Sequence, residues 1–63
     1  MTQYQRENLE VLCEDDSEGM PPGELPHPRV VVSMIEEGWV KTVESSPVIL
    51  VRATPEGCEA LNA

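Results

Sequence analysis

The sequence predicts a small α+β domain in which helices flank one β-hairpin. Three observations predict it: apolar residues at helical spacing near the N-terminus, two β-branched runs separated by Ser-Ser-Pro, and a Thr-Pro-Glu helix start after the second run. A chain of 63 residues forms at most one domain, residues 1–63. Such a chain buries only about 60% of its unfolded surface, so its core is thin.

The first helix is expected over residues 3–14. Thr2 and Gln5 have the spacing of a capping box, in which each side chain satisfies the other residue's backbone N–H. Leu9, Leu12 and Cys13 then recur at helical spacing. The carboxylates that follow are unfavourable at a helix C-terminus, so we expect the helix to end near Cys13.

Residues 15–28 contain four of the six prolines, and only a short turn at 23–25 is expected there, anchored by Leu25. We expect a helix over residues 28–37. Pro28 suits a first helical position, Val31, Met34 and Ile35 have helical spacing, and a Gly follows at position 38. The run of valines at 30–32 has strand composition and is the alternative.

Residues 39–44 and 48–53 are predicted to form the hairpin. A last helix should begin after Thr54, which suits the N-cap, with Pro55 at the first helical position. We expect the elements to share one core. Its expected members are Leu9, Leu12, Val31, Met34, Ile35, Ile49, Val51 and Leu61.

Two stretches of this sequence, MIEEGWV and VILVRATPEGCEAL, resemble the winged-helix family, in particular small bacterial and phage regulators. The resemblance implies a small winged-helix-like domain with the order helix, short turn or helix, helix, hairpin wing, C-terminal helix. The chain departs from DNA-binding members because only His27 and Arg29 stand at the start of the middle helix, where several basic and polar residues are usual. Its proline-rich segment also leaves little room for a normal second helix.

The chain carries 12 acidic and 4 basic residues, for a net charge of −8. Residues 1–28 hold seven acids and one base, so most of the excess charge lies in the N-terminal half. This charge disfavours nonspecific attraction to phosphate and to anionic lipid. Neither a signal peptide nor an apolar run long enough for a membrane span is present, so a cytoplasmic location and no membrane partner are expected.

The sequence favours a non-enzymatic regulatory module that binds a protein, an acidic adaptor or inhibitor whose size and charge suit a phage protein. Trp39 is a candidate interface anchor, although a lid over the core is the alternative. The acidic run, with Asp15, Asp16 and Glu18, is a candidate contact for a basic partner surface; the alternative is a solvated loop. The run lacks the ligand spacing of a calcium loop.

The second hypothesis is a winged-helix DNA-binding regulator, expected to be a homodimer. Its candidate phosphate contacts are Arg29, Lys41 and Arg52, with Ser45 and Ser46 at the hairpin tip. The alternative is that these are ordinary solvated charges, because the chain lacks the basic stripe of a nucleic-acid footprint.

A metal or redox protein that uses Cys13, Cys58 and His27 is a third class. The spacing of the two cysteines is not that of zinc ligands, and small, separate thiols are favoured over a disulfide. His27 has no catalytic partner nearby in sequence, so a helix-entry role is favoured. No cofactor, metal site or catalytic residue is predicted.

Overall fold

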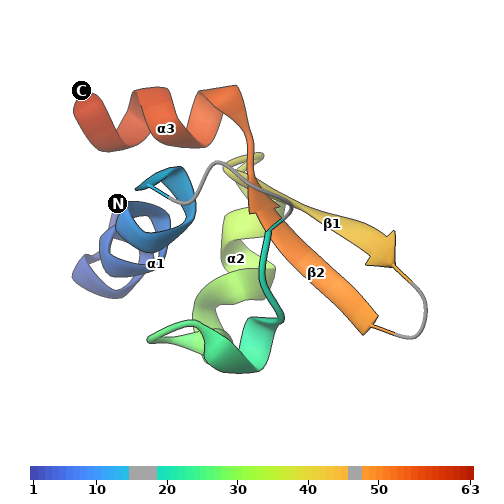
Figure 1. The fold of residues 1–63 in the computed structure, drawn as a ribbon. Coiled ribbons are helices and arrows are strands. Elements are labelled where there is room, and N and C mark those ends of the chain that lie inside the picture. The colour runs from blue at the N-terminus through green and yellow to red at the C-terminus, as the bar shows by residue number, and fades with distance from the viewer. Residues whose placement is uncertain (15–18, 46–47) are drawn as a thin grey trace.

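A computed structural model describes residues 1–14, 19–45 and 48–63, which form a small α+β domain (Figure 1). Three α-helices surround the base of a two-stranded antiparallel hairpin, and two short 3₁₀ turns precede the second helix. The elements in chain order are α1 (Gln3–Glu14), η1 (Pro22–Glu24), η2 (Pro28–Val30), α2 (Val31–Glu36), β1 (Val40–Ser45), β2 (Val48–Ala53) and α3 (Pro55–Asn62).

The predicted capping box of α1 is confirmed. The backbone N–H of Thr2 donates to Oε1 of Gln5 over 2.8 Å, and the backbone N–H of Gln5 donates to Oγ1 of Thr2 over 3.2 Å. Gln5 also donates from Nε2 to Oγ of Ser33 over 3.0 Å, which ties α1 to α2. The cap that starts the first helix therefore also positions the middle one.

The expected helix over residues 28–37 is confirmed as helical, although its first turn is the 3₁₀ segment η2 and α2 spans only Val31–Glu36. Gly38 has a φ of +79°, which ends the helix in the left-handed conformation that glycine adopts most easily. The strand alternative for the valine run is wrong. Pro28 and Gly38 fix the two ends, and the helical spacing of the apolar residues outweighs their β propensity.

The hairpin has the expected strands, with β1 shifted by one residue from the predicted 39–44. Its register pairs Val40 with Ala53 and Ser45 with Val48. A single β-bridge joins Met20 to Val51 on the other edge of β2, through backbone hydrogen bonds of 2.8 and 3.0 Å. The sequence does not predict this bridge, because one paired residue gives no periodic signal.

The start of α3 is held at the junction of α2 and β1. Thr54 accepts from the backbone N–H of Gly57 over 3.0 Å, as the N-cap prediction requires, and donates from Oγ1 to the carbonyl of Gly38 over 2.6 Å. A side chain at position 57 would collide with the carbonyl of Trp39, so only glycine allows this approach. Local capping and one tertiary contact thus fix the same turn.

Cys13 and Cys58 form a disulfide between α1 and α3, with a Cα–Cα distance of 5.8 Å. The preference for separate thiols was therefore wrong. Local sequence gave no sign that the end of α1 meets α3. Disulfides are typical of proteins in oxidising compartments. The cytoplasmic location expected above stays a prediction.

Among the described residues, the core shares five members with the predicted list and gains Leu25 and Val40. The buried apolar side chains are Leu9, Leu12, Leu25, Val31, Met34, Val40 and Val51. Leu61 is half-buried and packs against this core, but Ile35 and Ile49 are 40% and 52% exposed, so their placement in the core was wrong. The six-residue α2 buries only the stripe of Val31 and Met34. Ile49 shares a face with Val51 but lies next to the Ser45–Val48 pair, at the end of the strands that extends away from the helices (Figure 1).

Neighbouring residues of α2 should respond oppositely to truncation. Met34→Ala removes a fully buried side chain and should cost about 2–5 kcal/mol, most of the stability of so small a core. Ile35→Ala should cost less than about 1 kcal/mol because Ile35 is exposed. Denaturant melts of the two oxidised variants test this, and equal losses would show that the orientation of α2 is wrong.

Candidate functional site

The segment around His27 is held against α1 by one buried side chain. Asn8 of α1 has no exposed surface, and its amide binds both main-chain groups of His27. Nδ2 donates to the carbonyl over 2.8 Å, and Oδ1 accepts from the N–H over 3.0 Å. Asn8 thereby satisfies the backbone where prolines on both sides prevent regular structure.

The His27 ring lies on the surface of α1 between two side chains of that helix. It stacks on Tyr4 with 4.3 Å between ring centroids and 24° between planes, and its Nε2 contacts Oε1 of Glu7 at short range. Gln3 donates from Nε2 to Oε2 of the same carboxylate over 2.9 Å. The hydrogen bonds from Gln3 and then from His27 hold the pKa of Glu7 below its ordinary value.

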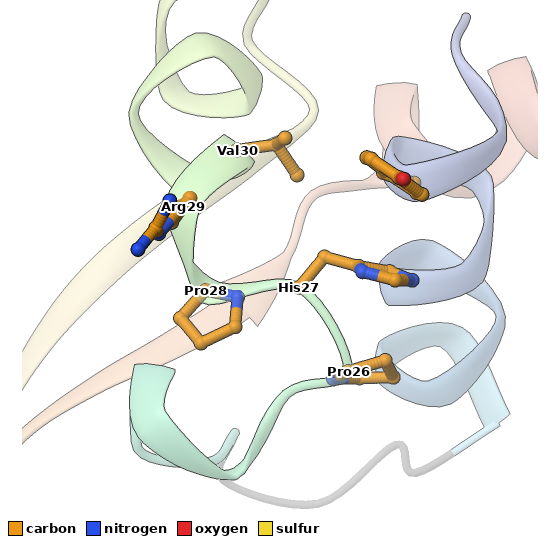
Figure 2. Close-up of a pocket in the computed structure, with 6 residues that line it drawn as sticks. Pro26, His27, Pro28, Arg29 and Val30 are labelled. Atoms are coloured by element: carbon orange, nitrogen blue, oxygen red, sulfur yellow. The ribbon is translucent and has the colours of Figure 1, made fainter.

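A pocket of about 350 Å³ opens beside this stack (Figure 2). Its lining residues are Tyr4, Pro26, His27, Pro28, Arg29 and Val30. An adjoining pocket of about 310 Å³ shares Tyr4 and Val30 and is also lined by Thr2 and Gln3. Figure 2 shows the His27 side chain directed to one side of the segment and Arg29 to the other. The pocket walls are therefore mainly apolar rings and aliphatic groups.

His27 precedes the first turn of the helical segment, as its helix-entry role requires, but the sequence did not predict this cluster. The available signal was the spacing of Tyr4 and Glu7, which places both on one face of a helix. Nothing local indicated that His27, 20 positions beyond Glu7, would lie on that face.

An exposed apolar strip continues from the pocket along α2. Val32 is 65% exposed and Ile35 is 40% exposed, one helical turn apart, and Pro28 begins the same helical segment. Glu36 and Glu37 are exposed at its end. We call Pro28, Val32, Ile35, Glu36 and Glu37 the α2 surface. It combines an apolar strip with carboxylates and carries no basic side chain.

The predicted protein-binding residues are only partly described by the structure. Trp39 is half-buried and packs against the core. Its backbone N–H donates to the carbonyl of Met34, and its own carbonyl accepts from the N–H of Thr54. Trp39 thus has a structural role, and its role as an interface anchor stays a prediction. Asp15, Asp16 and Glu18 lie outside the described residues.

The predicted phosphate contacts are partly brought together. Lys41 and Arg52 are exposed and pair directly across the hairpin, an arrangement that is unfavourable for like charges. Arg29 is also exposed, on η2. Ser45 ends β1, and Ser46 lies outside the described residues. The structure therefore places two of the five candidates side by side.

Neither a metal-ligand cluster nor a membrane-spanning helix occurs within residues 1–14, 19–45 and 48–63. No three His, Cys, Asp or Glu side chains in these ranges gather closely enough to hold an ion. None of the helices in these ranges combines the length and the apolar character needed to cross a bilayer. No family model, curated protein or solved structure matches the chain.

Removing the Asn8 side chain should loosen the His27 segment. Asn8→Ala leaves two backbone groups without partners, and each such group costs about 1–3 kcal/mol when buried. Asn62→Ala removes an exposed amide from α3 and is the matched control, expected to cost under about 0.5 kcal/mol. Denaturant melts compare the two, and equal losses would contradict the role of Asn8.

The Glu7 contacts should make stability depend on pH. Because the folded-state pKa of Glu7 is lowered, its stabilising effect is present above the ordinary glutamate pKa of about 4.3 and is lost as the pH falls through the lower folded-state value. Glu7→Gln should therefore melt below the parent near neutral pH, and the gap should close in acid. Glu10→Gln removes the same charge from an exposed position of α1 and controls for net charge. A gap independent of pH would argue against this contribution.

Proposed function

We propose that this protein is a non-enzymatic regulatory module that binds another protein through the α2 surface. The observation that carries the proposal is the exposure of Val32 and Ile35 on a helix whose other side supplies Val31 and Met34 to the core. Contiguous exposed apolar groups with a polar rim are typical of protein interaction sites. The pocket beside Tyr4 extends this apolar strip.

The charge of the chain favours a partner with a basic rim. The net charge is −8, and Glu36 and Glu37 stand at the end of the apolar strip. Carboxylates around an apolar centre favour and orient an approaching basic surface, mainly by raising the association rate. We therefore propose apolar contact at Val32 and Ile35, with Lys or Arg of the partner near the two glutamates.

A winged-helix architecture is the finer description that we propose for the fold. The observed order of helix, short 3₁₀ turns, helix, hairpin and helix supports it, because the sequence resemblance implies that order. The bridge from Met20 to Val51 adds a third segment to the hairpin. A small sheet of this kind beside the middle helix also fits a winged-helix architecture. Fold alone does not determine function, so this proposal is separate from the choice of partner.

DNA binding, with or without homodimerisation, is the second candidate. The adjacent Lys41 and Arg52 favour it, since both extend from one face of the hairpin. The α2 surface opposes it, because Val32, Ile35 and Glu36 offer no donor for base edges or phosphates, and Arg29 is the basic side chain of this helical segment. A homodimer would double acids and bases alike, so the excess negative charge would remain.

A single exposed substitution should separate binding from folding. Val32→Glu places a carboxylate in the apolar strip and should abolish partner capture without lowering the melting temperature appreciably. Ile49→Glu changes an equally apolar, 52% exposed position on the hairpin and should leave capture intact. The measurement is affinity capture from nuclease-treated extract of the source cell, followed by calorimetric titration of the purified partner. Equal binding by both variants would contradict the proposed surface.

Random duplex DNA should give no gel shift at about 0.15 M salt, the physiological ionic strength. Three phosphate contacts would give a salt slope of only about −2.7, against twelve opposing carboxylates. Sequence-specific binding that persists at this salt and disappears in Arg29→Ala would instead establish the DNA candidate.

A further inference from the structure

The disulfide joins two helices that lie far apart in sequence. Cys13 is the penultimate residue of α1, Cys58 lies within α3, and 45 positions separate them. α3 contacts both α1 and β2 (Figure 1). Both cysteines are half-buried, so neither is among the enclosed residues of the core.

The two ends of α3 are attached differently. Its N-terminal turn is fixed by Thr54, which bonds to Gly38, and by the close approach of Gly57 to the carbonyl of Trp39. Gly57 is also the one buried residue of this helix. The first turn therefore has several contacts that do not involve the disulfide.

The C-terminal half of α3 has weak contacts besides the disulfide. Arg6 donates from Nη1 to the carbonyl of Leu61 over 3.4 Å, a long hydrogen bond. The Leu61 side chain is half-buried against the core. Asn62 is exposed, and within the described residues its side chain donates to the carbonyl of Cys58 in the same helix. The covalent bond is thus the main attachment between this half of α3 and α1.

We infer that α3 is a redox-controlled strap, docked on α1 when the cysteines are oxidised and released from Cys58 onward when they are reduced. A dithiol reductant supplies two electrons and two protons. The sulfur–sulfur bond breaks, Cys13 and Cys58 each end as thiols, and the reductant closes to its own disulfide. The turn at Thr54 and Gly57 stays docked, while the Leu61 side chain leaves its position against the core. This inference does not depend on the proposed partner.

The test is hydrogen exchange of the full chain before and after treatment with dithiothreitol, with intact mass used to count the thiols. The amides of residues 59–62 should exchange about thirtyfold faster or more after reduction, since crosslinks of this kind correspond to factors of about thirty to a thousand. Amides of α2 and the hairpin should keep their rates. Cys13→Ser/Cys58→Ser should resemble the reduced parent and should not respond to dithiothreitol.

Three results would overturn the inference. Unchanged exchange at 59–62 after reduction would show that other contacts hold α3. A simultaneous loss of protection in α2, the hairpin and α3 would show a crosslink that supports the whole fold and no local release. Two free thiols in the parent after exposure to oxidised glutathione would show that the bond does not form. The reduced parent is the primary sample, so the result does not require the variant to fold.

Discussion

The buried amide of Asn8 is the interaction on which most of this structure depends. It binds the N–H and the carbonyl of His27 and so fixes the position of the proline-rich segment relative to α1. Pro28 follows at once and starts the helical segment that becomes α2, so the direction of α2 is set by this contact. The stack of His27 on Tyr4, the pocket and the exposed strip of α2 are all consequences of the same placement.

Small size explains why polar and covalent contacts carry so much of the fold. Within the described residues, seven buried apolar side chains form the core, which for a chain of this length supplies only about 3–5 kcal/mol. The crosslink between Cys13 and Cys58 is the main attachment of the C-terminal half of α3 to α1, because the other contacts there are a long hydrogen bond and one half-buried side chain. Formation of the disulfide between Cys13 and Cys58 can therefore decide whether α3 is docked. In a larger domain, the same disulfide would only add to a core that is already sufficient.

The elements were predictable from the sequence because their signals are local. Thr2 with Gln5, Gly38, and Thr54 each fix a helix end within a few residues, and each behaves as expected. The failures are all nonlocal. The pairing of the cysteines, the bridge of Met20 and the position of His27 depend on tertiary packing that one sequence does not encode in any short pattern. Ile35 was wrongly placed in the core because helical spacing identifies the apolar face of a helix but does not determine how much of that face is buried.

The misplaced isoleucine bears directly on the choice between partners. Had Ile35 been buried, α2 would present little apolar surface, and the paired Lys41 and Arg52 would be the most distinctive exposed feature. Its exposure beside Val32 gives α2 an apolar strip ending in two carboxylates. A DNA groove presents neither basic groups nor a large apolar surface to this strip, and the phosphates repel Glu36 and Glu37. A protein surface can offer both, with desolvation of the strip supplying affinity and the glutamates orienting the approach. Under the proposed protein-binding function, the apolar strip would select the partner, and the cations on the hairpin would have no part in that choice.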